Sequence, residues 1–170
     1  MMRKKYFAVL YFIMAFSLFS AKAQTGDKQS LPDIELKLHN NKTIKLTQLK
    51  GKVVLFDFWY RGCYPCLQAI PELIKLQEEF KDNLVIIGIN NMDIQEDVVD
   101  YFNYKNVNYS STYQTDSNIL KMLNVKVTAY PTIILYDRQG NMIRTDTGYS
   151  KAGLRSLRRA IKKAVETGSK

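Results

Sequence analysis

One segment constrains the fold more than any other: a strand pattern that is apolar on both faces and runs directly into a pair of cysteines. Residues 53–59 read Val-Val-Leu-Phe-Asp-Phe-Trp, as expected of a central strand in a parallel sheet. A helical pattern follows from about residue 63 to residue 80, and it opens with Cys63-Tyr64-Pro65-Cys66. Both cysteines of the chain therefore lie where a buried strand ends and a helix begins.

The other segments alternate between strand and helix patterns. Residues 34–38 and 43–46 flank a turn at 39–42, which predicts a β-hairpin. Further strands are expected at 84–90, 109–114, 132–136 and 142–147, and helices at 93–105, after Asp116 and after Ser150. This order predicts an α/β fold in which a central mixed sheet is flanked by helices and preceded by an N-terminal hairpin extension.

The first residues have the pattern of a secretory signal peptide. Three basic residues (3–5) precede an apolar run at residues 6–19, and Ala21-Lys22-Ala23 supplies a small-x-small cleavage pattern. The alternative is an uncleaved membrane anchor, but this apolar run is short for a span of about 20 residues. We therefore expect cleavage after Ala23 and export to the periplasm.

Cleavage there divides the chain into three parts: a signal peptide (1–23), a flexible mature N-terminus (24–30) and one folded domain (31–170). The signal peptide holds four basic residues and no acidic ones, so its removal lowers the net charge from +9 to +5. So small an excess argues against nucleic-acid binding by an exported chain. We expect a monomer.

A cysteine pair at the start of a helix has the surroundings of a redox-active disulfide. Backbone N–H groups and the helix dipole stabilise a thiolate at this end of a helix. We expect Cys63, nearer the exposed tip, to be the nucleophile and Cys66, one turn further in, to resolve the mixed disulfide. Pro65 is compatible with the first helical turn.

Other interpretations of the pair fit less well. A zinc site needs four ligands, and only His39 could join the two cysteines. Covalent haem attachment needs a histidine where Leu67 stands. A purely structural disulfide would close a very short loop and would restrain little chain entropy. We expect no cofactor beyond the disulfide itself.

Asp57 interrupts the apolar strand. A buried carboxylate is costly unless it is paired or neutral. Burial would raise its pKa and would suit the group to exchange protons with a nearby cysteine. The alternative is a side chain that points to a solvated rim of the sheet.

Together these motifs resemble the thioredoxin superfamily, and within it the exported TlpA/ResA-like thiol–disulfide oxidoreductases. The similarity covers about residues 31–165. Residues 31–34 and 49–54 look like that family's lead-in to the active site, and Asp57-Phe58-Trp59 followed by the two cysteines looks like the active site itself. Pro71 falls where the family has the proline of its active-site helix. Tyr130-Pro131-Thr132 is similar to the loop whose cis-proline packs against the disulfide.

The resemblance implies a thioredoxin-like fold and disulfide exchange with protein thiols. Cys63 and Cys66 would be the catalytic pair, and Asp57 would handle protons. Six residues would shape the surface that meets the substrate: Trp59, Gly62, Tyr64, Pro65, Tyr130 and Pro131. The resemblance favours a reductant that is recharged by a membrane thiol-electron donor.

Three departures from the family pattern concern the substrate. Gly62 stands where the family usually has tryptophan, Ala69 stands where some cytochrome-maturation members have glutamate, and Tyr64-Pro65 replaces Gly-Pro or Glu-Pro. Peroxiredoxins share the lead-in, but Tyr60 occupies the position of their threonine, which makes a thiol peroxidase a weaker alternative. A further alternative is a non-catalytic peptide-binding module with an inert disulfide.

Overall fold

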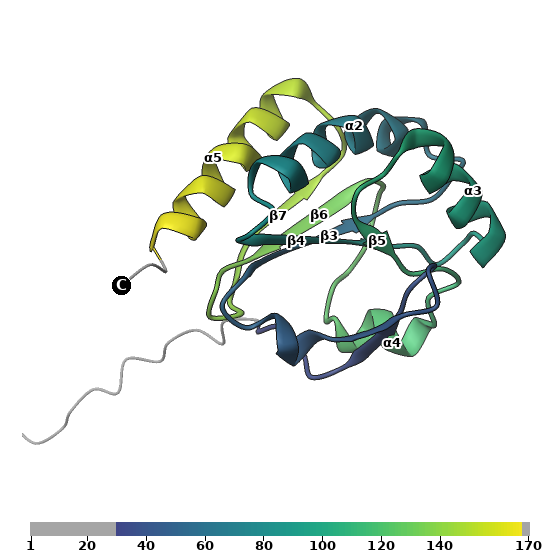
Figure 1. Ribbon diagram of the computed structural model, residues 1–170, viewed down its shortest axis with the longest axis horizontal. Helices are drawn as coiled ribbons and strands as arrows, with labels where there is room; N and C mark the ends of the chain where they lie inside the picture. Colours follow the sequence, from purple (N-terminus) through teal and green to yellow (C-terminus); the bar gives the residue numbers. More distant parts are fainter. Residues whose placement is uncertain (1–29, 168–170) are drawn as a thin grey trace, which may run out of the picture.

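The computed structural model describes residues 30–167, so the predicted signal peptide and residues 24–29 lie outside the described part. The elements, shown in Figure 1, are β1 (Glu35–Lys37), β2 (Thr43–Lys45), η2 (Leu46–Leu49), β3 (Val53–Phe58), α2 (Tyr64–Glu79), β4 (Leu84–Ile89), α3 (Gln95–Lys105), β5 (Ser110–Ser111), α4 (Ser117–Met122), β6 (Thr132–Tyr136), β7 (Met142–Thr147) and α5 (Lys151–Thr167).

Five strands form one mixed sheet in the order β5-β4-β3-β6-β7. β3, β4 and β5 run parallel, whereas β6 is antiparallel to β3 and β7 is antiparallel to β6. All six residues of β3 are buried, as the unbroken apolar pattern predicted. The strands β1 and β2 pair in a sheet of their own. The predicted mixed sheet with an N-terminal hairpin is therefore confirmed.

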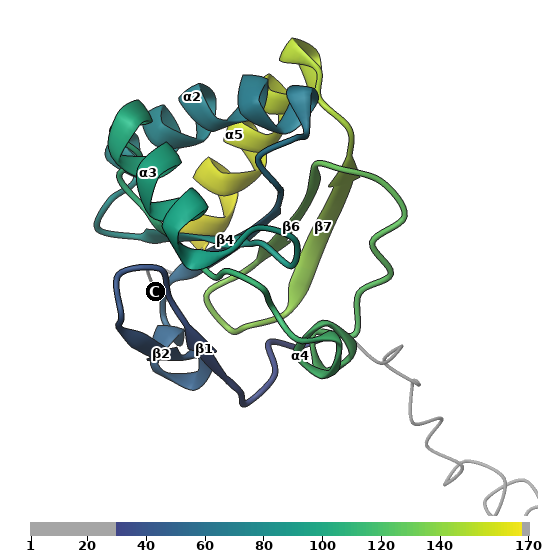
Figure 2. The same cartoon turned by 90° about the vertical axis from the view of Figure 1, so that its right-hand side faces the viewer.

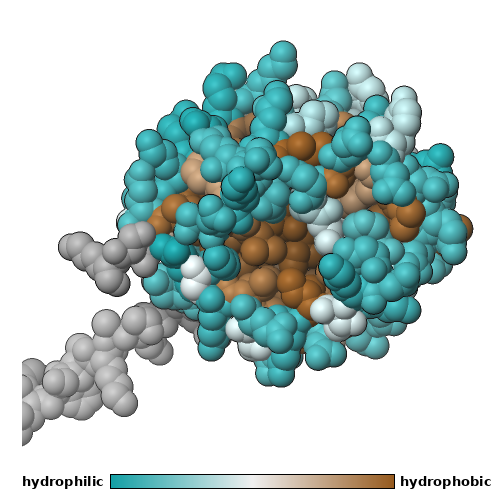
Figure 3. Space-filling view, viewed as in Figure 1, coloured by the Kyte–Doolittle hydropathy of each residue, from teal (hydrophilic) through white to brown (hydrophobic). Residues whose placement is uncertain are grey.

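The two faces of the sheet are covered unequally. The long helices α2, α3 and α5 all pack on one face, and their buried residues share an apolar cluster with Val53, Leu55 and Trp59 (Figures 1 and 2). The opposite face is covered by the hairpin, η2 and the short α4, which meet Val54, Phe56 and other residues of the sheet in a second cluster. Figure 3 shows apolar side chains gathered near the centre of the molecule's face in this view. Successive β3 side chains thus belong to opposite cores.

Strand β5 is much shorter in the structure than the sequence predicted. Residues 109–114 were expected to be extended, but only Ser110 and Ser111 pair with β4. Beyond them the chain folds back over the end of β4, where the Thr112 hydroxyl accepts from the Asn90 N–H at 3.0 Å and the Thr115 N–H donates to the Asn90 carbonyl at 2.9 Å. These bonds satisfy the backbone N–H and C=O of Asn90, which follows β4, and the pairing of β5 with β4 ends there.

The outer edge of β5 is covered by the hairpin turn. The His39 N–H donates to the Ser111 carbonyl at 2.8 Å, and the Ser111 N–H donates to His39 Nδ1 at 3.2 Å. At the other edge, β7 alternates exposed and half-buried residues and carries the ion pair between Arg144 and Asp146. Its ladder with β6 has an irregularity at Leu135/Tyr136.

Candidate active site

Cys63 and Cys66 form a disulfide at the N-terminus of α2, with an S–S distance of 2.02 Å. Cys63 is the N-cap residue, and its Sγ accepts from the Cys66 N–H at 3.2 Å. Pro65 lies in the first turn of the helix, where a missing N–H costs no intrahelical hydrogen bond. Cys63 is 4% exposed and Cys66 is 0% exposed, so in this oxidised form both are buried and Cys63 is only slightly the more accessible.

Asp57 is fully buried, which excludes the solvated rim. Its neighbours at i±2, Leu55 and Trp59, belong to the cluster that contains both cysteines, so the carboxyl group lies on the cysteine side of the sheet. Burial raises the pKa of Asp57 to about 7. At neutral pH the group can therefore either take up or release a proton.

Trp59 is fully buried and belongs to the same apolar cluster as both cysteines. Its indole stacks on Phe102 with ring centroids 5.2 Å apart, and its Nε1–H donates to the Ser111 hydroxyl at 2.9 Å. A Cβ added to Gly88 would lie 2.8 Å from Trp59 Nε1 and 2.6 Å from Ser111 Oγ. The bare Gly88 therefore makes room for the tryptophan and its hydrogen bond.

The Tyr130–Pro131 peptide bond is cis, as the resemblance implied. Three contacts hold this loop: the Tyr130 ring meets Tyr60 edge-on at 5.2 Å, the Tyr130 hydroxyl donates to Asn91 Oδ1 at 2.9 Å, and the Gly148 N–H donates to the Pro131 carbonyl at 2.8 Å. Tyr60 and Tyr130 thus form a continuous aromatic wall between the cysteine loop and the proline loop.

The loop before Cys63 is tied to the start of α3. The Arg61 N–H donates to Asp93 Oδ2 at 2.6 Å, and the Arg61 guanidinium pairs with Asp97. Gly62 and Tyr64 remain on the outside, and Tyr64 is 70% exposed. Arg61, Gly62 and Tyr64 are therefore exposed to a partner next to the disulfide. Trp59, which was expected on the surface that meets the substrate, is fully buried and does not reach that surface.

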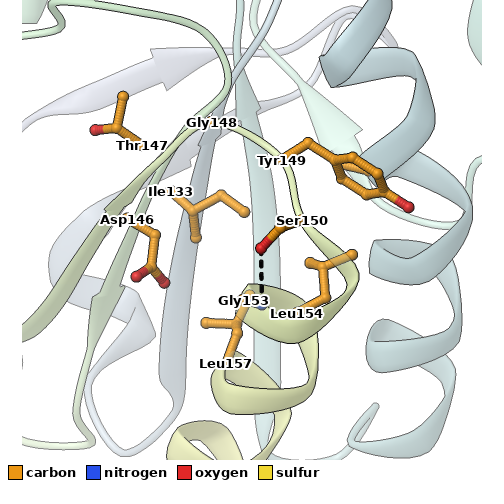
Figure 4. Close-up of a pocket in the computed structure, with 10 residues that line it drawn as sticks. Ile133, Asp146, Thr147, Gly148, Tyr149, Ser150, Gly153, Leu154 and Leu157 are labelled. Atoms are coloured by element: carbon orange, nitrogen blue, oxygen red, sulfur yellow. Dashed lines mark hydrogen bonds between the residues drawn. The ribbon is translucent and has the colours of Figure 1, made fainter.

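A hollow of about 260 Å³ opens between β6, α2 and the turn from β7 to α5 (Figure 4). It is lined by Ala69, Ile133 and the Gly148–Ser150 turn, and the Ser150 hydroxyl at its edge caps α5 by accepting from the Gly153 N–H at 3.0 Å. Ala69 is buried in this wall. The resemblance placed a glutamate of some cytochrome-maturation members at this position, and here it is a buried methyl group. Asp57 is a buried carboxylate on the same side of the sheet as the cysteines.

Several residues of the site were not singled out in the sequence. Asn91 and Asp93 lie directly after buried β4, and polar residues at the carboxyl end of a parallel strand are a usable signal for a site. Gly88, in the interior of a strand, was a signal for close packing. Tyr109 gave no signal, because a tyrosine in an apolar run is ordinarily a core residue.

Within residues 30–167, no three His, Cys, Asp or Glu side chains gather in an arrangement that could hold a metal ion. The same residues include no helix that is long and apolar enough to cross a membrane.

Comparison with known proteins places this geometry in a family. Residues 28–145, more than half of the chain, match the AhpC/TSA family. The chain belongs to the AhpC/TSA family. Relatives of this AhpC/TSA protein include the thioredoxin-like protein YneN of Bacillus subtilis, which is 31% identical over 82% of this chain and 87% of its own length. The thiol–disulfide oxidoreductase ResA of the same organism is 28% identical over 78% and 73%.

Solved structures share the fold of this AhpC/TSA chain. A structure described as a putative DsbE thiol:disulfide interchange protein from Chlorobium tepidum has a TM-score of 0.72 at 24% identity, covering 81% of this chain and 96% of its own. A putative thioredoxin from Neisseria meningitidis has the same TM-score and identity and covers 84% and 93%. The predicted thioredoxin-like fold is confirmed, and the relatives together with the Cys63–Cys66 disulfide identify a thiol–disulfide oxidoreductase of this family.

Proposed function

We propose that the protein is an exported reductant that exchanges its Cys63–Cys66 dithiol with the disulfides of protein substrates. The observation that carries the proposal is the disulfide itself, which caps a helix N-terminus on the same side of the sheet as a buried carboxyl group that titrates near neutrality. A structural cross-link would need neither the helix end nor the carboxyl group.

The first half of the reaction uses the reduced protein. The Cys63 thiolate attacks one sulfur of a substrate disulfide, the substrate S–S bond breaks, and the released substrate thiolate takes up a proton. The Cys66 N–H, which faces Cys63 Sγ, and the α2 dipole favour the thiolate over the thiol. The product is a mixed disulfide between Cys63 and the substrate.

The second half closes the protein disulfide. Cys66 gives its proton to Asp57 and attacks Cys63 Sγ, which releases the second substrate sulfur as a thiolate that is then protonated. Two electrons have moved to the substrate, and the protein holds the disulfide seen in this structure. Asp57 suits this step because its pKa of about 7 lets it accept the proton and return it near neutral pH.

The substrate would dock against the outer surface around the disulfide. Gly62 and Tyr64 supply the exposed side, and the half-buried Tyr130 supplies the opposite side, while Pro131 is buried and shapes the loop that carries Tyr130. Aromatic rings offer a large apolar contact area to the segment that flanks a substrate cysteine. Such a surface suits protein disulfides of varied sequence.

The proposal includes export out of the cytoplasm and a supply of electrons from the membrane. The pattern over residues 1–23 supports cleavage by signal peptidase, and a reductant outside the cytoplasm needs a thiol-electron donor in the membrane. The mass of the exported protein should correspond to a chain that starts at Gln24, and retention of residues 1–23 would contradict cleavage.

The enzymatic test is the reduction of insulin by dithiothreitol. The wild-type protein should accelerate it, Cys63→Ala should abolish the acceleration, and Cys66→Ala should accumulate a mixed disulfide visible by non-reducing mass analysis. A Cys63→Ala variant with full activity would refute the mechanism. A wild-type protein without activity would favour the peptide-binding module.

The direction of electron flow is tested by the equilibrium potential of the cysteine pair in graded thiol buffers. A reductant should lie near about −270 mV, whereas a value near about −120 mV would identify a disulfide donor. The peroxidase alternative is tested separately by consumption of hydrogen peroxide. We expect none, because Tyr60 stands where peroxiredoxins have a threonine.

A further inference from the structure

Two buried polar groups on the cysteine side of the sheet lack an ordinary hydrogen bond. Among the described residues, neither oxygen of Asp57 has a hydrogen-bond partner, and the Tyr109 hydroxyl has none either. Asp57 is 0% exposed and Tyr109 is 7% exposed. A buried polar group without a partner is costly, so its persistence calls for an explanation.

The two groups belong to the same core. Tyr109 is a member of the cluster that contains Cys63, Cys66 and the residues flanking Asp57 at i±2. Its ring packs edge-on against Phe102 at 5.6 Å, and Phe102 in turn stacks on Trp59. Tyr109 thus packs in the core on the face of the sheet that carries the Asp57 carboxyl group, and its hydroxyl favours the ionised form of that carboxyl group.

The other titratable groups near these two come from the start of α2 and from α3. From α2 the titratable groups are Cys63 and Cys66, which are joined as a disulfide here, and α3 supplies the half-buried Tyr101. The strand neighbours of Asp57 are Gly88 and Ile133, and α5 contributes Leu157, Ile161 and Ala164.

We propose that Tyr109 is a positioning residue for the exchange reaction: its buried hydroxyl is the group that turns toward the Asp57 carboxylate and donates to it when Asp57 is ionised. The inference rests on the proposed function of Asp57. It gives the tyrosine the role of setting the pH at which the proton acceptor for Cys66 works. A hydroxyl can rotate to suit either state, which a fixed cation cannot.

The electrostatics agree with this role. The hydroxyl lowers the pKa of Asp57 against the stronger opposite effect of burial. Burial, followed by the charge of Asp57, raises the pKa of Tyr109 well above its usual value, so the tyrosine stays a neutral donor throughout the working range. Removal of the hydroxyl should therefore make Asp57 harder to ionise.

The test is an NMR titration of the oxidised protein with ¹³C-labelled aspartate and tyrosine side chains. Asp57→Asn identifies the Asp57 carboxyl signal by its loss. In Tyr109→Phe the midpoint of that signal should move to higher pH by about half a unit or more. Tyr136→Phe is the matched control, because Tyr136 also has a buried hydroxyl without a hydrogen-bond partner but belongs to the core on the opposite face.

Equal midpoints in wild type and Tyr109→Phe would overturn the proposal, as would equal shifts in Tyr109→Phe and Tyr136→Phe. If Tyr109→Phe does not fold, the wild-type protein provides a second test. Its Tyr109 Cζ signal should show an inflection at the titration midpoint of Asp57, and this inflection should disappear in Asp57→Asn. A Tyr109 signal that does not change with pH would refute the contact. The titration needs no turnover, so it can fail while the insulin assay succeeds, and the reverse.

Discussion

Asp57 makes the folded protein less stable as the pH rises. In the unfolded chain an aspartate loses its proton near pH 4, whereas in the fold the pKa of Asp57 is raised to about 7. Between these values folding takes up a proton, so the free energy of unfolding falls with increasing pH and levels off above about pH 7. This loss of stability would be the cost of the proton-acceptor role that we propose for Asp57.

We therefore predict that Asp57→Asn removes this pH dependence. Urea unfolding of the oxidised proteins should show the variant gaining stability relative to wild type by about 3 kcal/mol between about pH 4.5 and about pH 8. A constant difference between the two proteins across this range would mean that Asp57 does not titrate there.

Gly88 gives a second prediction at this scale. In Gly88→Ala the new methyl group would lie against Trp59 and Ser111, so the variant should lose about 1 to 3 kcal/mol of stability and change the tryptophan emission. Trp59 is the sole tryptophan, so fluorescence reports this site alone. Gly51→Ala is the control: its added methyl meets open space, so it should cost about 1 kcal/mol of backbone strain and leave the emission unchanged. Unchanged emission in Gly88→Ala would contradict the packing.

At the residue level, the sequence singled out the cysteine pair and the other proposed site residues more readily than the residues packed around them. Cys63, Cys66, Asp57 and Pro131 stood out because each breaks a local pattern or matches a motif. Tyr109 and Asn91 did not, since their role depends on side chains that the fold brings from distant segments: Asn91 meets Tyr130 across 39 positions of sequence. No local pattern contains such a contact.

Among the elements, α5 makes two kinds of contact: buried apolar contacts that stabilise the fold, and surface ion pairs that contribute little to stability. Leu157 is 1% exposed against the sheet, whereas the neighbouring Arg158 pairs with Glu79 of α2 at the surface. We predict that Leu157→Ala costs about 2 to 5 kcal/mol and that Arg158→Ala costs less than about 1 kcal/mol. Urea unfolding measures both, and equal losses would refute this division.

Element positions were predicted well where periodicity was strong. β6 and β7 have the predicted bounds, and Asp116 and Ser150 cap α4 and α5 as expected. The 3-10 helix η2 was not predicted, because four residues are too few to show a period. The predicted length of β5 was wrong, because its end is decided by bonds from Thr112 and Thr115 to Asn90, the residue that follows β4.

For the molecule as a whole, β3 contributes side chains to the apolar clusters on both faces of the sheet and so links them into one cooperative unit. Its alternate residues enter opposite clusters, so neither core can be lost alone. We predict that Leu46→Ala, on the face opposite Trp59, costs about 2 to 5 kcal/mol and lowers the urea midpoints from tryptophan fluorescence and from circular dichroism equally. A fluorescence midpoint that stays in place while the other moves would reveal separate units.

The treatment of the sheet edges has a consequence for how the protein behaves when it is concentrated. His39 occupies the outward N–H and C=O of Ser111 at one edge, and the other edge carries the paired charges of Arg144 and Asp146 beside a ladder irregularity. Growing fibrils recruit chains through long, flat, unguarded strands. Both edges of this sheet are therefore poor templates for amyloid, so concentrated solutions of the folded protein should not form fibrils.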